Sequence, residues 1–270
     1  MRFIYDYMKL KRGINSIQSK HCLFMLLPSI IGFLIFWIYP FIKNFYYMFA
    51  DGNFFKNIEY LFNNRYFLLA IKNTFLFTGF STPIAVMISL IFAMLTLKVS
   101  KKNAFIRNAF FLPVIMPSAV LVAVWQILFP TITPFKSLLL IYLWKYSGLY
   151  YIIVLTALAS LDQNIIDAAM IDGASYMKRV IHIMIPSIIP TLFFIFILSI
   201  SDSLKIFRES YLLYGTYPDE EVYMLQNFLN NHFNKLNYNY ISTASILLVV
   251  MYVFVAILGM LERRWSEKIW

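Results

Sequence analysis

Charged residues are scarce in this sequence: Asp, Glu, Lys and Arg make up 13% of its 270 residues, whereas hydrophobic residues make up 61%. A soluble domain is typically about half apolar and about one quarter charged, so this composition excludes an ordinary soluble domain. The apolar residues form long continuous runs, unlike the alternating segments of roughly ten residues in a membrane β-barrel. Because only helices and closed barrels satisfy the backbone in lipid, the sequence predicts an all-α integral membrane protein.

The residues that build metal sites and nucleotide sites are also few. The single cysteine, Cys22, excludes an internal disulfide and a multi-cysteine metal site. The three histidines, His21, His182 and His232, fall in different predicted segments, so a shared metal site is not expected. None of the eight glycines forms the Gly-x-x-x-x-Gly-Lys phosphate loop, and no nucleophile motif is present. We therefore expect no catalytic residue, no metal site and no cofactor bound by this chain.

Six apolar runs are long enough to cross a bilayer, which takes about 20 helical residues. A basic tail at 1–21 precedes them and a short tail at 262–270 follows them. The first run has no small-residue cleavage site after it, so we interpret it as a retained span and not as a signal peptide. The predicted spans lie at about 22–42, 73–97, 108–129, 137–161, 187–207 and 241–261.

The distribution of basic residues predicts the orientation of these spans. In a soluble protein the net charge of +10 would suggest nucleic-acid binding, but basic residues also collect in the cytoplasmic loops of membrane proteins. Six spans place both ends of the chain on one side. That side holds 14 of the 23 Lys and Arg residues, and the opposite side holds seven. We therefore expect a multi-pass protein of the cell membrane with both termini in the cytoplasm and no nucleic-acid partner. The high content of Lys, Asn, Ile and Tyr suggests a bacterial source.

The segment 162–186, here called the helix-pair loop, is polar but has the signals of a folded structure. Asp162 suits the N-cap of a short helix, and Gly173 suits its end, because glycine accepts a left-handed backbone. A second helix is expected from about Ala174 to near Pro186. Two short helices joined at an angle, with small side chains at the tip, suit a socket on another protein. The simpler alternative is a cytoplasmic hairpin that merely connects two spans.

The helix-pair loop resembles the EAA loop of ATP-binding-cassette (ABC) importer permeases. The pattern consists of an acidic residue, two alanines, Asp-Gly-Ala and an Ile-x-hydrophobic-Pro ending. Its positions are held by Asp167, Ala168, Ala169, Asp172, Gly173, Ala174, Ile183, Ile185 and Pro186. The family usually has Glu where this chain has Asp167, whose side chain is one methylene shorter.

Further motifs in the same order extend the resemblance over nearly the whole chain, to the six-span carbohydrate-importer permeases of maltose-type systems. These motifs are Leu27-Pro28-Ser29, Tyr39-Pro40-Phe41, Asn73-Thr74, Arg107, Pro113, Pro117, Trp125, Lys205-Ile206-Phe207 and Ser242-Thr243-Ala244. The resemblance implies the type I ABC importer permease fold, with six transmembrane helices and a cytoplasmic coupling-helix loop.

The same resemblance implies a function and a set of partners. The chain would form half of a translocation path for a carbohydrate, most simply an oligosaccharide, and a second homologous permease would supply the other half. A dimeric ABC ATPase would bind ATP and Mg, and an extracytoplasmic solute-binding protein would deliver the sugar. The ATPase would contact Asp167, Ala168, Ala169, Asp172, Gly173, Ala174 and Pro186.

Polar and aromatic side chains at membrane depth are candidates for contact with the solute, because ionisable groups there are costly. Sugars need hydrogen-bond partners for their hydroxyls and an aromatic face for the ring. The candidates are Tyr142, Lys145, Tyr146, Ser199, Asp202 and Ser203. The alternative is structural: Lys145 would reach an interface, Asp202 would lie at a helix end, and the serines would join helices. The tyrosines in 211–240 are candidates for contact with a binding protein, or they belong to a solvated loop.

Three other functional readings stay open at this point. The same machinery could carry a polyol, glycerol phosphate or peptide. A solitary secondary transporter or channel would predict inverted repeats and a buried ionisable pathway, and neither is apparent. A membrane-embedded enzyme would predict His, Asp or Glu clustered at one depth.

Overall fold

The structure, a computed structural model, describes residues 24–49, 54–100 and 104–269. Within these ranges the chain is helical and contains no strand. The elements in chain order are η1 (Leu34–Ile38), α2 (Tyr39–Phe49), α3 (Phe54–Asn63), α4 (Arg65–Ser100), α5 (Ala104–Ile115), α6 (Ser118–Leu128), α7 (Pro134–Ala159), α8 (Gln163–Ile171), α9 (Tyr176–Arg179), η2 (Val180–Met184), α10 (Ile185–Ser187), α11 (Ile189–Leu204), α12 (Phe207–Tyr214), η3 (Glu220–Val222), α13 (Leu225–Asn234) and α14 (Tyr238–Ile269).

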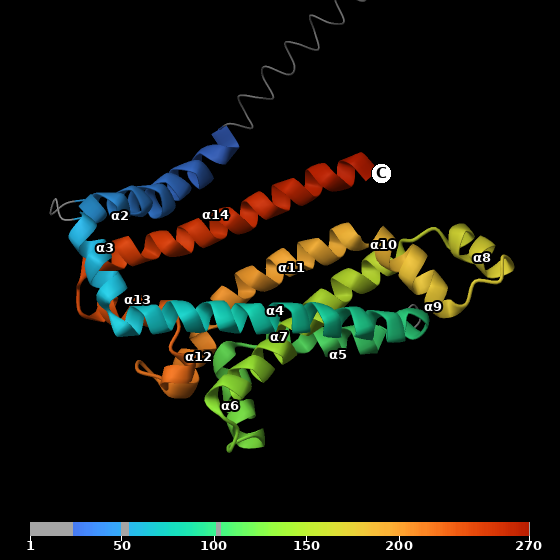
Figure 1. The fold of residues 1–270 in the computed structure, drawn as a ribbon, viewed down its shortest axis with the longest axis horizontal. Coiled ribbons are helices and arrows are strands. Elements are labelled where there is room, and N and C mark those ends of the chain that lie inside the picture. Colours follow the sequence, from blue (N-terminus) through green and yellow to red (C-terminus); the bar gives the residue numbers. More distant parts are fainter. Residues whose placement is uncertain (1–23, 50–53, 101–103, 270) are drawn as a thin grey trace, which may run out of the picture.

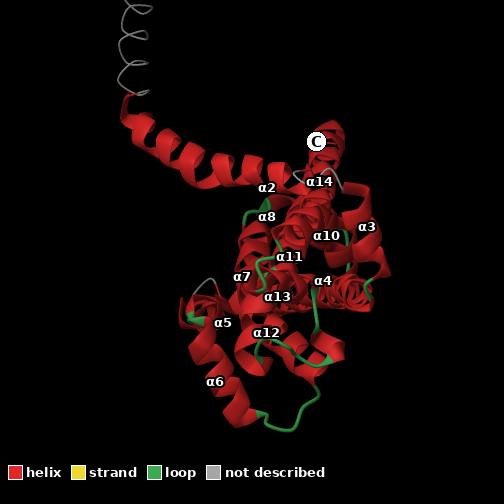
Figure 2. Cartoon of the chain, turned by 90° about the vertical axis from the view of Figure 1, so that its left-hand side faces the viewer, coloured by secondary structure: helices red, strands yellow, loops and turns green. Residues whose placement is uncertain are grey.

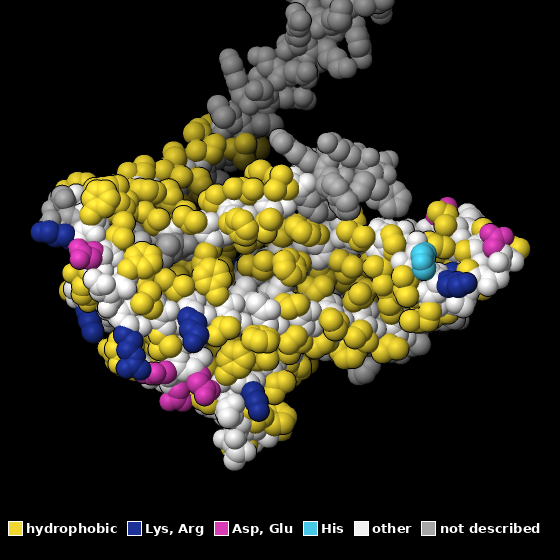
Figure 3. Space-filling view, in the orientation of Figure 1, with side chains coloured by type: hydrophobic (Ala, Val, Ile, Leu, Met, Phe, Trp, Pro, Cys, Tyr) yellow, Lys and Arg dark blue, Asp and Glu magenta, His cyan; other side chains and the backbone are white. Residues whose placement is uncertain are grey.

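Five helices in the described part are long and apolar enough to cross a membrane. They are Phe24–Phe49, Arg65–Leu97, Pro134–Ala159, Ile189–Tyr214 and Tyr238–Leu261. A bent pair, Arg107–Ile115 and Ser118–Leu128, makes a sixth crossing if the two helices count as one span. On the face drawn in Figure 3, charged side chains gather toward the two ends of the long axis and hydrophobic side chains cover the region between them.

The helix α7 lies at the centre of the bundle, in contact with α4, α5 and α11 (Figure 1). Its largest fully buried side chains are Tyr142, Tyr150 and Tyr151. At Gly148 the backbone of α7 approaches α5 so closely that a Cβ atom would lie 1.7 Å from the Phe110 carbonyl oxygen. Residues 144–148 lie within the continuous helix α7, and Gly148 allows the close helix–helix contact.

The predicted span at 108–129 is not one straight helix: α5 and α6 meet at 106°. The bend falls at Met116 and Pro117, between the end of α5 at Ile115 and the start of α6 at Ser118. A proline disfavours helical backbone in the residue before it, which explains why α5 ends here.

The segment after the fifth span is also more structured than the sequence suggested. The helix α11 ends at Leu204, and α12 begins three residues later at Phe207. The polar stretch 208–240 then contains most of α12, together with η3 and α13, and α13 packs against α4 and α14. Figure 2 shows the N-terminal helix that includes α2 extending away from the rest, and this helix contacts α14.

Candidate functional site

The helix-pair loop has the local geometry that its sequence predicts. The Asp162 side chain accepts a hydrogen bond from the backbone N–H of Asn164 at 2.9 Å, which caps α8. At the other end Gly173 has φ +78°, and the Ala174 N–H donates to the Ala169 carbonyl at 2.9 Å. The predicted cap at Asp162 and the predicted helix end at Gly173 are both confirmed.

The first helix of this loop is exposed, although its Met170 Sδ accepts a hydrogen bond from Arg179 Nη1 at 3.0 Å. No residue of α8 or α9 is buried, and the two helices form one tip of the molecule (Figure 1). Asp167, Ala168, Asp172 and Gly173 are exposed, whereas Ala169, Ala174 and Pro186 are half-buried. Apolar side chains are exposed beside them, among them Ile171, which is 87% exposed. Exposed small and apolar side chains on a projecting helix form a surface that can bind another protein.

The second half of the loop anchors it to the bundle. Ser175 caps α9 by accepting a hydrogen bond from the Lys178 N–H at 3.4 Å. The expected single helix from Ala174 to Pro186 is divided into α9, the π turn η2 and α10. Within η2, Val180 and Met184 are buried in the main hydrophobic core. The buried second half therefore holds the exposed first half in place.

Asp167 lies at the junction between the loop and the bundle. Its Oδ1 accepts a hydrogen bond from Gln163 Nε2 at 3.0 Å. A cavity of about 430 Å³ separates α8 from the end of α4, and Asp167, Tyr176 and Arg179 help to line it. The Arg179 guanidinium lies 6.0 Å from the centre of the Tyr176 ring. The shorter acidic side chain is thus held along its own helix by a contact to one of its two oxygens.

Three of the six candidate solute contacts belong to one buried hydrogen-bond network between α7 and α11. The Tyr142 hydroxyl lies 2.7 Å from both the carbonyl oxygen and Oγ of Ser199. Tyr150, which the sequence analysis missed, lies 3.5 Å from Tyr142 and donates to Asp202 Oδ2 at 3.0 Å. Tyr142 and Ser199 are fully buried, so their hydrogen-bonding capacity is used inside the chain. Tyr150 follows Tyr142 by eight residues and Tyr146 by four, and this helical spacing was the available signal.

The structure places Lys145 in a buried ion pair, whereas the structural alternative had it reach an interface. Its Nζ lies 2.5 Å from Glu209 Oε1, and the two side chains are 12% and 1% exposed. Ser118 Oγ donates to the same carboxylate oxygen at 2.7 Å, so the cluster joins α6, α7 and α12. Neither Glu209 nor Ser118 had been identified from the sequence, because Glu209 lies in a segment expected to be an external loop.

The two remaining candidates contact different neighbours. The ring of Tyr146 stacks on Tyr150 with centres 6.3 Å apart, and Lys145 Nζ lies 5.1 Å from the Tyr146 ring centre. Ser203 Oγ lies 2.9 Å from Thr78 Oγ1, which joins α11 to α4. Lys205 Nζ lies 3.3 Å from Asp202 Oδ1, and Asp202 keeps part of its side chain exposed. Asp202 is therefore the accessible edge of an otherwise internal network.

No group of three or more His, Cys, Asp or Glu residues in the described ranges has the geometry to hold a metal ion. The side chains that the site brings together are hydrogen-bonding and aromatic groups suited to binding and to helix packing.

Comparison with known proteins identifies the fold and the family. The chain is 22% identical to a probable starch degradation products transport system permease protein of Thermoanaerobacterium thermosulfurigenes, over 89% of this chain and 92% of that protein. It is 26% identical to an sn-glycerol-3-phosphate transport system permease protein of Pectobacterium atrosepticum, over 65% of this chain and 70% of that protein. A crystal structure of a bacterial ABC transporter involved in the import of the acidic polysaccharide alginate superposes with a TM-score of 0.79 at 21% identity, over 94% of this chain and 99% of that one.

The structural similarity confirms the predicted type I ABC importer permease fold. The family described as binding-protein-dependent transport system inner membrane component matches residues 73–267, which is most of the chain. The protein is thus a multi-pass membrane protein and a non-catalytic transport subunit. This chain belongs to the inner membrane components of binding-protein-dependent transport systems, the permease subunits of ABC importers.

Proposed function

We propose that this chain forms half of the translocation path for a carbohydrate, most simply an oligosaccharide, that an extracytoplasmic binding protein delivers. Two of the similar proteins are described by carbohydrate solutes, starch degradation products and alginate. A second homologous permease supplies the other half of the path. A dimeric ABC ATPase, carrying ATP and Mg, drives the transport.

The observation that carries this proposal is the exposed helix-pair loop. α8 has no buried residue, yet both of its ends are fixed, by the Asp162 cap and by the Gly173 turn. A rigid element with an exposed apolar surface can follow the motion of a bound partner and transmit it to α11. The excess of basic residues on the same side supports a cytoplasmic position for this loop and for both termini.

The solute path is proposed to pass the α7–α11 network. Asp202, whose side chain is 16% exposed, is the member that a passing sugar would contact, because Tyr142, Tyr146, Ser199 and Ser203 are buried. Lys145 contributes by holding α12 through Glu209. Asp202 offers an acceptor for a sugar hydroxyl, and Tyr150 holds it in position by donating to its Oδ2.

The test is the ATPase activity of the complex, coexpressed with its ATPase, second permease and binding protein and reconstituted in lipid. Mono- and oligosaccharides are screened together with sn-glycerol 3-phosphate. We expect stimulation by one sugar class, and we expect Ala168→Arg, which adds a bulky charge to the exposed surface of α8, to abolish it. Ala168→Ser keeps a small, uncharged side chain at the same position and should leave stimulation intact.

The outcomes separate the alternatives. Stimulation by sn-glycerol 3-phosphate alone would show that the ATP-driven importer carries a phosphorylated polyol and not a sugar. This solute is the second candidate because the Pectobacterium relative is described as an sn-glycerol-3-phosphate permease. Transport that continues without an ATPase subunit would overturn the proposal in favour of a solitary transporter.

A further inference from the structure

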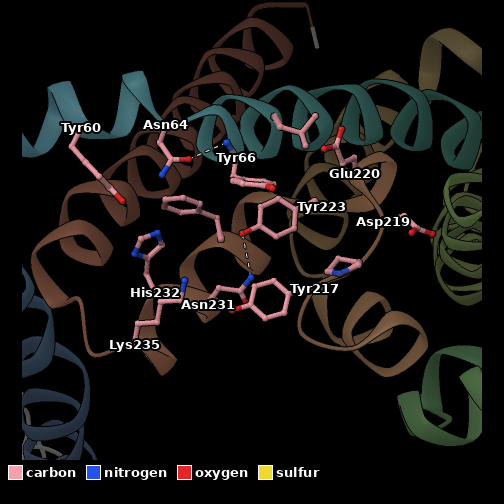
Figure 4. A pocket seen from close by; sticks show the side chains of 13 residues that line it. Tyr60, Asn64, Tyr66, Tyr217, Asp219, Glu220, Tyr223, Asn231, His232 and Lys235 are labelled. Atoms are coloured by element: carbon pink, nitrogen blue, oxygen red, sulfur yellow. Dashed lines mark hydrogen bonds between the residues drawn. The ribbon is translucent and has the colours of Figure 1, made fainter.

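A second cavity lies at the end of the molecule opposite the helix-pair loop, among α3, α4, α13 and the segment before it. Its volume is about 520 Å³, within the range of about 300–1,000 Å³ typical of small-molecule sites. Four tyrosines line it: Tyr60, Tyr66, Tyr217 and Tyr223. Figure 4 shows Tyr60, Asn64 and Tyr66 along one side and Asn231 and His232 along the other. The cavity is outside the α7–α11 network and no role has yet been given to it.

Two buried polar side chains in the wall have hydrogen-bonding capacity to spare. Asn231 is 4% exposed and donates through its Nδ2 to the Tyr223 hydroxyl at 3.2 Å, but its Oδ1 has no partner among the described residues. His232 is 8% exposed, and its Nδ1 also lacks a partner in that part of the chain. A buried polar atom without a partner costs free energy, so each of these two atoms needs an explanation, such as an ordered water or a bound ligand.

The walls of this cavity are fixed before any ligand arrives. Asn73 Nδ2 donates to the carbonyl oxygens of Glu220 at 2.6 Å and Tyr223 at 3.0 Å. Thr74 Oγ1 accepts from the Leu225 N–H at 3.0 Å, so the Asn-Thr pair ties the segment 220–225 to α4. Because these walls are already ordered, the protein loses less conformational entropy when a ligand binds.

The charges around the cavity do not favour an ionic ligand. Glu220 is already paired with Arg65, with Nη2 2.9 Å from Oε1 and 3.1 Å from Oε2. Lys235 and Asp219, one of each sign, also line the cavity. The remaining side chains are phenols, amides, one imidazole and the apolar Leu69, Pro218 and Phe228. Together they suit an uncharged ligand that has both hydroxyls and apolar C–H groups.

We propose that this cavity binds an uncharged sugar ring, as an outer subsite that the solute occupies on its way between the binding protein and the membrane path. The tyrosine faces would pack against the C–H groups of the ring, and Asn231, His232 and Asn64 would exchange hydrogen bonds with its hydroxyls. This inference rests on the proposed carbohydrate function and adds to it a second place of sugar recognition.

Saturation-transfer NMR on the complete transporter in lipid nanodiscs, without binding protein, tests the inference. The probes are maltose, lactose, xylobiose, any sugar that stimulates the ATPase, and the acyclic polyol mannitol. We expect signal from at least one ring sugar and none from mannitol. Tyr217→Ala should weaken that binding about threefold to tenfold, the range expected for one lost aromatic contact.

Tyr217 is suited to this test because its side chain is 68% exposed, so its loss leaves the core intact. Tyr211→Ala is the matched control, since Tyr211 is an exposed tyrosine on α12 that does not line the cavity. The affinity of the Tyr211→Ala variant for the sugar should equal that of the unaltered protein.

Two results would overturn the inference while leaving the proposed function standing. One is sugar-stimulated ATPase activity with no effect of Tyr217→Ala on sugar binding. The other is that no sugar signal is seen without the binding protein, while Tyr217→Ala weakens the affinity of the transporter for the unloaded binding protein. That result would make the cavity a contact site for the binding protein. Absence of stimulation by every sugar would instead refute the proposed function itself.

Discussion

At the scale of single residues, one buried ion pair holds three helices of this protein together. Lys145 Nζ and Ser118 Oγ both contact Oε1 of Glu209, and the Glu209 side chain is almost completely buried. Removing one member of a buried pair leaves an uncompensated charge, whereas replacing both members by apolar or neutral groups is often tolerated.

The Lys145→Met variant should therefore be less stable by about 3–5 kcal/mol. The double variant Lys145→Met, Glu209→Gln should recover most of that loss, because no unpaired charge remains. Unfolding in detergent, followed by tryptophan fluorescence, measures both. A double variant as unstable as the single one would show that the pair is not the source of the stability.

His232 predicts a pH dependence at the opposite end of the molecule. Burial lowers the pKa of His232, and nearby Lys235 lowers it further. The neutral imidazole is thus favoured in the folded protein. Asp219 and Glu220 are the acidic groups that line the same cavity.

The stability that the neutral His232 contributes should be fully present above the ordinary histidine pKa of about 6.5. It should be lost as the pH falls through the lowered pKa of the folded protein, by at most about 1.4 kcal/mol per pH unit. His232→Phe keeps a ring against Phe228, whose ring centre lies 4.3 Å away, and removes the titration. Melting curves between pH 7.5 and 5.5 compare the two proteins. An identical pH dependence in both would contradict this assignment.

At the scale of elements, the helix-pair loop depends on one backbone conformation. Gly173 has φ +78°, a left-handed value that costs most L-residues about 1–2 kcal/mol. Asparagine tolerates this conformation, whereas proline cannot adopt it. No atom lies within 4 Å of the position that a Cβ of Gly173 would take, so only the backbone decides the outcome.

Solute transport in lipid should therefore be nearly unchanged in Gly173→Asn, reduced in Gly173→Ala and abolished in Gly173→Pro. Gly79→Ala is the control, because its Cβ would also meet nothing within 4 Å and its backbone is helical. Full transport by an assembled Gly173→Pro complex would show that the turn is not needed for coupling.

The elements differ in how far the sequence predicts them. The cap at Asp162 and the turn at Gly173 are local, so a few residues suffice to predict them. The bend between α5 and α6 was missed, since a proline such as Pro83 can also lie inside an unbroken helix, here α4. A proline therefore marks a possible bend without deciding whether the neighbouring helices use it.

Contacts between distant residues explain the rest of what was missed. The Lys145–Glu209 pair joins residues 64 apart in the sequence, and the Arg65–Glu220 pair joins residues 155 apart. Composition showed that Lys145 and Asp202 were unusual at membrane depth, but their partners depend on how α7, α11 and α12 pack. The cavity lined by Tyr60, Tyr66, Tyr217 and Tyr223 likewise forms only when α3 and α13 meet at the start of α4.

At the scale of the whole molecule, two surfaces at opposite ends are assigned to two kinds of partner. The helix-pair loop is proposed to face a cytoplasmic ATPase, and the cavity among α3, α4 and α13 is proposed to face the side from which sugar arrives. The described chain between them is a bundle of apolar helices around α7. The account therefore predicts that the two ends lie on opposite sides of the membrane.

A cysteine accessibility and cross-linking measurement tests this arrangement most directly. With Cys22→Ser as background, Ile171→Cys and Phe55→Cys place single thiols at two highly exposed positions, 87% and 82%, at opposite ends. In membranes with the full complex, Ile171→Cys should cross-link to the ATPase and Phe55→Cys should not. On intact spheroplasts, an impermeant thiol reagent should label Phe55→Cys alone. Labelling of Ile171→Cys from outside, or its failure to cross-link to a co-assembled ATPase, would contradict the account.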